Sequence, residues 1–220
     1  MKIICLIVVS VQKINCFMNR FFLVLFAVIL TINLRASEDI KSILESGKLS
    51  EVSGDYQEAL FLYNKVIEID SSNYDAHLYI GVVYLIQNQY SESLSYFYKA
   101  IAIDTSRSEA YFYRGNLQVE LGSVFGAVHD YTKAIEKNPN DVTYYMSRGF
   151  AFANMGDYFN AVNDYSIAVQ LDPEASKSYH NLAKMQGRLE NIEEVCEKIT
   201  QLKKQGSVRA EIVYLNFCLT

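Results

Sequence analysis

Residues 142–175 read VTYYMSRGFAFANMGDYFNAVNDYSIAVQLDPEA, and this stretch decides the fold because its pattern returns along the chain at a fixed interval. One small residue marks that interval. It recurs every 34 positions, at Gly47, Gly81, Gly115, Gly149 and then Ala183. Self-similarity at a fixed period is the signature of a solenoid of stacked units, and 34 residues is the period of a helix-turn-helix unit. The spacing therefore predicts an all-α solenoid.

Small and large residues also keep fixed places within each 34-residue window. The small ones are Ala59, Ser93, Ala127, Ala161 and Val195. The large ones, four positions later, are Tyr63, Phe97, Tyr131, Tyr165 and Ile199. A small residue lets two helix backbones approach, and a neighbouring aromatic side chain fills the groove beside it. We therefore expect Gly149 and Ala161 to face each other across the two helices of their repeat.

Turn residues recur between the two helices of each expected pair. They are Gly54-Asp55, Asn88-Gln89, Gly122-Ser123 and Gly156-Asp157. Gly adopts the left-handed conformation that ends a first helix, and an Asp or Ser oxygen accepts from the free amides that open the second. Both prolines of the chain, Pro139 and Pro173, follow second helices, where they stop the helix.

Two neighbouring windows share a full set of residues at matching places. They are Tyr111-(x)3-Gly115 with Gly122, Ala127-(x)3-Tyr131-(x)2-Ala134 and Pro139, and then Tyr145-(x)3-Gly149, Gly156-Asp157-Tyr158, Ala161-(x)3-Tyr165-(x)2-Ala168 and Pro173. This pattern resembles the tetratricopeptide repeat family, over residues from about 40 to about 205. The resemblance implies a right-handed α-solenoid of about five repeats that binds other proteins. The repeats would lie near 40–73, 74–107, 108–141, 142–175 and 176–209, within a domain 37–209 that is capped by the tail 210–220.

The first 36 residues differ from the rest, because they contain four basic residues and no acidic one. An apolar run follows Arg20 and covers the 14 residues 21–34. A helix of that length spans about 21 Å, which is short of a hydrocarbon core of about 30 Å but suits a secretory signal peptide. We predict that residues 1–36 are a signal peptide or leader, with Met18 as a possible true start and the mature chain beginning near Ser37. The protein would then be exported, to the periplasm or the medium.

Two alternatives to cleavage stay open. Residues 21–34 could remain as a membrane anchor, because flanking residues and bilayer thinning accommodate a short apolar segment. A lipid-modified Cys16 is the other, although Lys13-Ile14-Asn15 before it is a poor context. Cys196 and Cys218 lie in the last repeat and the tail, either as two buried thiols or as one bridge in an oxidising compartment.

The chain without its leader is acidic. The whole sequence has a net charge of −5, and removing the leader leaves 16 basic residues against 25 acidic ones, a net charge of −9. A protein that binds phosphate backbones needs a basic stripe, so nucleic acid is disfavoured as a partner. Adhesion to anionic lipid is disfavoured for the same reason. A membrane contact is therefore expected only through an uncleaved N-terminal segment.

No pattern of residues points to catalysis, to a metal or to a cofactor. The three histidines, His77, His129 and His180, have no partner at metal-ligand spacing, and the sequence contains no phosphate-binding loop or nucleophile motif. We therefore expect no enzyme activity, no cofactor and no metal site. Arg114 and Arg148 each stand 16 positions before an aspartate, Asp130 and Asp164. These predict Arg–Asp pairs, either structural or with the arginine turned toward a ligand carboxylate.

In tetratricopeptide repeats, the first helix of each unit lines a concave groove. The resemblance places the groove on Leu78, Val82, Leu85, Ile86, Phe112, Asn116, Val119, Glu120, Met146, Phe150, Ala153, Asn154, Lys177, His180, Lys184 and Arg188. This groove is apolar in the middle and basic at its C-terminal end. It would complement a protein or peptide partner with apolar anchors and an acidic end, although the basic residues could equally be solubilising groups on a capping unit.

The leading expectation is a non-enzymatic interaction scaffold. It would be exported or membrane-tethered and would bind a protein or peptide partner in the concave groove. One alternative is a structural subunit of a cell-envelope assembly. A weaker one is a cytosolic co-chaperone-like adaptor, because Val82 and Phe150 interrupt the set of residues with which such proteins hold a C-terminal carboxylate.

Overall fold

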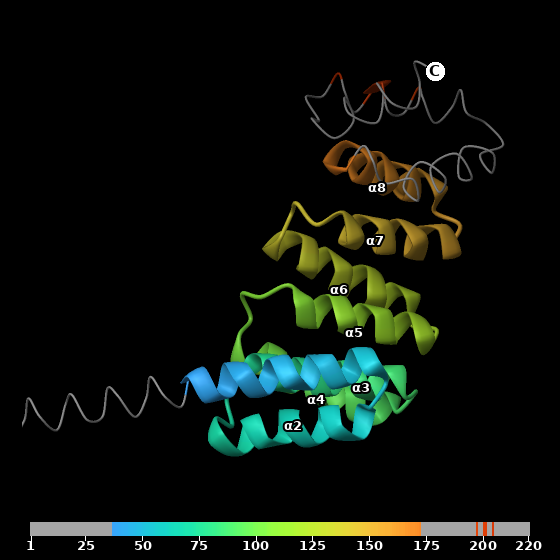
Figure 1. The fold of residues 1–220 in the computed structure, drawn as a ribbon. Coiled ribbons are helices and arrows are strands. Elements are labelled where there is room, and N and C mark those ends of the chain that lie inside the picture. The colour runs from blue at the N-terminus through green and yellow to red at the C-terminus, as the bar shows by residue number, and fades with distance from the viewer. Residues whose placement is uncertain (1–36, 173–196, 198–199, 202–203, 205–220) are drawn as a thin grey trace, which may run out of the picture. The chain divides into compact units, whose positions relative to one another are not determined.

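The protein, described by a computed structural model over residues 37–172 and at 197, 200, 201 and 204, is a solenoid of helix-turn-helix repeats. Eight helices lie in residues 37–172, in four consecutive antiparallel pairs (Figure 1). They are the helix of residues 37–53, α2 (Tyr56–Ile69), α3 (Tyr74–Ile86), α4 (Tyr90–Ile103), α5 (Glu109–Glu120), α6 (Val124–Lys137), α7 (Val142–Asn154) and α8 (Tyr158–Leu171). The expected fifth repeat, 176–209, lies outside the described range. The chain divides into two compact units, residues 1–71 and 72–220.

The turn between the helices of each pair is made by one residue with positive φ. These residues are Gly54 (83°), Asn88 (59°), Gly122 (75°) and Gly156 (77°), as the sequence predicts. The predicted side-chain caps form at two of the turns, where Asp55 accepts from the amide of Glu58 at 3.1 Å and Asp157 from that of Asn160 at 3.2 Å. The prediction is wrong for Ser123, which makes no side-chain cap bond. Its turn is exposed, so water can satisfy the free amides there.

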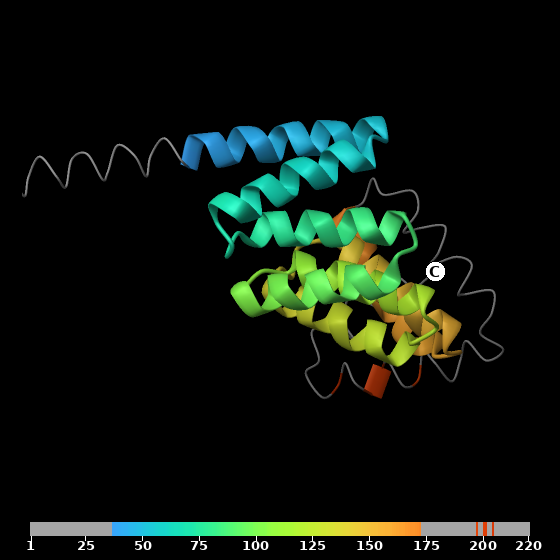
Figure 2. The same ribbon diagram turned by 90° about the horizontal axis from the view of Figure 1, so that it is seen from below.

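In the first unit, the helix of residues 37–53 and α2 lie side by side (Figure 2). Gly47 makes this possible, because a Cβ at that position would run into the ring of Tyr63. The ring is fully buried, and its hydroxyl donates to the carboxylate of Glu51 at 3.0 Å. The small marker residue therefore sets the spacing of the two helices in this pair.

In the second unit, α5 to α8 stack in chain order (Figure 1). Each repeat repeats the contact seen at Gly47. A Cβ at Gly81, Gly115 or Gly149 would meet Phe97, Tyr131 or Tyr165 at 2.6, 2.7 and 3.0 Å, respectively. The Cβ position of Gly149 also lies 3.3 Å from the carbonyl oxygen of Ala161, which confirms the expected close approach.

Neighbouring repeats are joined by hydrogen bonds between residues 36 positions apart. The Tyr74 hydroxyl accepts from the backbone amide of Ala110 at 2.9 Å, at the start of α5. Ser108 and Tyr144 share a hydrogen bond of 3.0 Å between their hydroxyls. Arg107 lies over the ring of Tyr74, with its guanidinium carbon 3.9 Å from the ring centroid. These contacts tie α3 to α5 and α5 to α7, which are the first helices of successive repeats.

The two predicted Arg–Asp pairs form within their repeats. Arg114 contacts Asp130 through two bonds of 2.6 and 2.7 Å, and Arg148 contacts Asp164 through two bonds of 2.8 Å. Burial favours a lower pKa for Arg148, but the hydrogen bonds and charge of Asp164 outweigh it and raise the pKa above its usual value. Arg148 also donates to Thr132 of the preceding repeat at 3.0 Å. Both pairs take the structural one of the two predicted roles.

The leader lies outside the described residues, as do His180, Cys196 and Cys218. The signal peptide, its cleavage near Ser37 and the state of the two cysteines therefore stay predictions. Among the helices that the structure describes, none combines the length and the apolar character needed to span a membrane.

Candidate functional site

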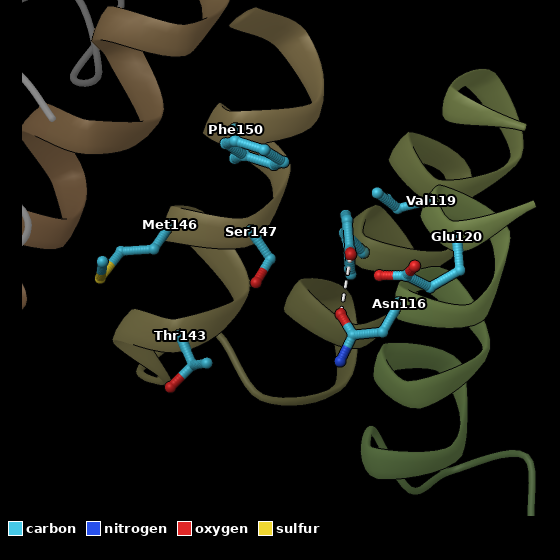
Figure 3. A pocket seen from close by; sticks show the side chains of 8 residues that line it. Asn116, Val119, Glu120, Thr143, Met146, Ser147 and Phe150 are labelled. Carbon is cyan, nitrogen blue, oxygen red and sulfur yellow. Dashed lines mark hydrogen bonds between the residues drawn. The ribbon is translucent and has the colours of Figure 1, made fainter. Parts of the chain in front are cut away.

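A pocket of about 470 Å³ opens between α5 and α7 (Figure 3). Both helices are the first of their repeats, and α6, which joins them in sequence, supplies one side chain. The lining residues are Asn116, Val119 and Glu120 of α5, Tyr131 of α6, and Thr143, Met146, Ser147 and Phe150 of α7. This volume lies within the range of about 300–1,000 Å³ that is typical of ligand pockets.

The lining residues reach the pocket because they are spaced by helical turns. Asn116 and Glu120 are four positions apart on α5, as are Met146 and Phe150 on α7, so each pair lies on one helix face. The repeat contacts place the two faces opposite each other. Tyr131, which lies beneath Gly115, reaches the same space with its hydroxyl.

The polar part of the pocket is formed by Tyr131, Asn116 and Glu120. The Tyr131 hydroxyl donates to the side-chain oxygen of Asn116 at 2.8 Å, which fixes the amide and leaves its nitrogen available as a donor. Burial, followed by the negative charges of Asp130 and Glu120, raises the pKa of Tyr131, so its hydroxyl keeps the proton that it donates. Figure 3 shows Glu120 of α5 and Ser147 of α7 reaching into the space between the two helices.

The apolar part of the pocket is dominated by Phe150. Phe150 is 52% exposed, whereas the aromatic residues that pack against the marker glycines, such as Phe97 and Tyr165, are buried. Val119 and Met146, which are half-buried, also line the pocket. A large apolar side chain that is exposed inside a pocket is available to a ligand without any rearrangement of the core.

The structure brings together part of the predicted groove. Asn116, Met146 and Phe150 line the pocket, together with Val119 and Glu120. Phe112 does not line it, because its ring packs against those of Tyr131 and Tyr144, with centroids 5.9 and 5.0 Å apart.

The remaining residues of the predicted groove either lie outside the pocket or fall beyond the residues that the structure describes. Leu78 and Val82 are buried in a core cluster with Ala110 and Leu117 of α5, so they offer no surface to a ligand. Ala153 is buried, Leu85 is half-buried against the same core cluster, and Ile86 and Asn154 are exposed outside the pocket. The predicted basic end lies beyond the described residues, at Lys177, His180, Lys184 and Arg188.

Three lining residues are absent from the predicted groove. Thr143 stands at the second position of its window, the place that Lys177 occupies in the next window, so its signal was present in the sequence. Ser147 and Tyr131 gave no such signal. Ser147 adjoins the expected stripe, and Tyr131 belongs to a repeat position that packing alone explains.

The pocket offers both apolar surface and hydrogen-bonding groups. It combines an apolar ring, an amide held by a tyrosine hydroxyl, two aliphatic hydroxyls and one carboxylate. No group of three or more His, Cys, Asp or Glu side chains is placed to hold a metal ion in the part of the chain that the structure describes.

Two family models match the sequence. One is described as TPR repeat and covers residues 53–87, and the other as tetratricopeptide repeat and covers residues 74–107. The second coincides with the window predicted from the 34-residue spacing. A search of curated proteins found no match.

Solved structures with the same fold cover most of the chain. A structure of PilF from Pseudomonas aeruginosa is 18% identical, with a TM-score of 0.67 and 78% coverage of each chain. A structure of MamA is 21% identical, with a TM-score of 0.59, and covers 83% of this chain and 91% of its own. YrrB, described as a TPR protein with an unusual peptide-binding site, is 24% identical, with a TM-score of 0.57 and coverages of 82% and 92%.

Proposed function

Because the chain is a tetratricopeptide-repeat protein, we propose that it is a non-enzymatic scaffold that holds a segment of a partner protein in the pocket between α5 and α7. One observation carries the proposal: Phe150 is half exposed inside a pocket that also presents fixed polar groups. Apolar anchors with a few placed polar groups are what a peptide-binding groove requires. The peptide-binding site in the description of YrrB supports this use of the fold.

Truncation of Phe150 is expected to weaken partner binding by about 2 kcal/mol, or roughly 30-fold, since large side chains in a central pocket carry most of the affinity. The probe is a peptide selected on the full-length protein from a phage-displayed library of random 12-residue sequences. Its dissociation constant is measured by calorimetry for the wild type and for Phe150→Ala.

Phe125→Ala is the matched control for this experiment. Phe125 is also an exposed phenylalanine, at 78%, but it lies on α6 and does not line the pocket. Its truncation is expected to leave the dissociation constant unchanged. Equal binding by the wild type and Phe150→Ala would move the partner site away from this pocket and contradict the proposal.

The second part of the proposal concerns where the scaffold works. The acid-free leader and its 14-residue apolar run support export, with the mature chain beginning near Ser37. N-terminal sequencing of the protein from its native host tests this. A terminus at residue 18 or earlier in the membrane fraction would instead support an anchor formed by residues 21–34.

A further inference from the structure

One charged side chain lines the pocket among the residues that the structure describes, and it is the carboxylate of Glu120. The residue is exposed, and within the described chain no hydrogen bond or ion pair ties this carboxylate to another group. The other polar lining residues, including Asn116, Thr143 and Ser147, are neutral. Among the described residues, the pocket therefore presents one negative charge without a basic partner, beside an apolar surface.

Within α5 to α8, as the structure describes them, no basic residue pairs with that charge. Arg114 and Arg148 are each held by two bonds to an aspartate. Lys133 contacts Glu136 of its own helix at 2.8 Å. Lys137 lies in the last turn of α6, at the far end of that helix from the turn that follows Glu120. His129 is exposed and lies 3.3 Å from a carboxylate oxygen of Asp130.

The pocket also offers what the stem of a basic side chain needs. Lysine and arginine bury their methylene groups against apolar surface and keep the charged head on polar groups. Val119 and Phe150 provide the apolar surface, and the exposed ring of Phe150 can additionally face a cation. The hydroxyl of Ser147 accepts hydrogen bonds, as the Glu120 carboxylate does.

We infer that this pocket binds a lysine or arginine side chain of the partner segment, next to an apolar residue, with Glu120 as the counter-charge. The inference rests on the proposed function and adds the chemistry of the ligand to it. It differs from the acidic end that the sequence predicts for the partner, because that expectation rests on Lys177, Lys184 and Arg188 and not on this pocket.

The test compares peptides selected from the same random library on the full-length wild type, Glu120→Gln, Glu120→Lys and Glu92→Lys. Glu92 is an exposed glutamate of α4 that does not line the pocket. Glu92→Lys therefore changes the net charge as much as Glu120→Lys does, but outside the pocket. Circular dichroism checks that each variant is folded. Wild type and Glu92→Lys are expected to enrich lysine and arginine relative to the unselected library. Glu120→Gln is expected to lose that preference, and Glu120→Lys to select aspartate and glutamate.

A double-mutant cycle then measures the pairing itself. One peptide selected on the wild type is synthesised with its arginine and with citrulline, which has the same shape without the charge; where the basic residue is lysine, the arginine form of that peptide is used. The neutral form is expected to bind the wild type about 1.5- to fivefold more weakly, the range for an exposed ion pair, and to bind Glu120→Gln with unchanged affinity. The difference in the wild type is expected to shrink at high salt.

The outcomes separate this inference from the proposed function. The charge assignment alone is overturned if the selected peptides require Phe150 but show no preference for basic residues. It is also overturned if replacing arginine by citrulline has the same effect on binding to the wild type and to Glu120→Gln. If no selected peptide depends on Phe150, both proposals are wrong. A dimer in sedimentation that Phe150→Ala dissociates would identify a second copy of the chain as the occupant and overturn the inference.

Discussion

Asp164→Ala is expected to destabilise the protein by about 3–5 kcal/mol, the cost of leaving a buried charge without its partner. Arg148 is 8% exposed and Asp164 is 1% exposed, so water cannot replace the two lost bonds of 2.8 Å. Urea denaturation followed by circular dichroism measures the effect as a lower midpoint.

Two further variants show whether the buried charge is the cause. Arg148→Met combined with Asp164→Leu removes both charges, and this change is expected to be close to neutral, because neither partner is left alone. Glu136→Ala breaks the exposed pair with Lys133, which is worth less than about 1 kcal/mol. A midpoint for Asp164→Ala equal to that of Glu136→Ala would mean that the Arg148 pair contributes no more than a surface pair.

Phe97→Ala is expected to cost a similar amount, about 3–5 kcal/mol, by removing a large side chain from a packed core. Phe97 is fully buried, lies against Gly81 and stacks on Tyr113 with ring centroids 6.2 Å apart. Phe125→Ala is the control, because that phenylalanine is exposed and its loss is expected to change stability by less than about 0.5 kcal/mol.

The same contact allows a test of the repeat register. A Cβ at Gly81 would lie 2.6 Å from the Phe97 ring, so Gly81→Leu alone overpacks the pair. In the double variant Gly81→Leu, Phe97→Ala, the new side chain enters the space that the ring vacates. The double variant is therefore expected to be more stable than the sum of the single changes predicts, by on the order of 1 kcal/mol. Strict additivity would mean that the two positions do not face each other.

The repeat contacts were predictable because they depend on residue size at fixed spacing. The contact between Gly149 and Ala161, the turns at Gly54, Gly122 and Gly156, and the Arg–Asp pairs all follow from fixed positions within one 34-residue window. A helix pair with a short turn brings such positions together whatever the neighbouring repeats contain. That is why local spacing was sufficient for them.

The depth of burial along the groove could not be predicted in this way. Val82 and Phe150 share the ninth position of their windows, yet Val82 is buried and Phe150 is half exposed. Leu78, at the fifth position of the same window as Val82, is also buried. Leu78 and Val82 pack into a cluster with Ala110 and Leu117 of α5, the first helix of the next repeat, and a single-window pattern does not show such a contact between repeats. The hydrogen bonds between residues 36 positions apart, such as that of Tyr74, also fall outside a strict 34-residue period.

The hydrogen bond from Arg148 to Thr132 has a consequence for ligand entry. Arg148 belongs to α7, which carries Ser147 and Phe150, whereas Thr132 adjoins Tyr131 on α6. The bond of 3.0 Å therefore ties α7 to the helix that carries Tyr131, and the two bonds to the buried Asp164 hold the guanidinium in place. A partner segment bound as proposed would meet a preorganised pocket, so most of the ordering entropy of association would fall on that segment rather than on the repeats.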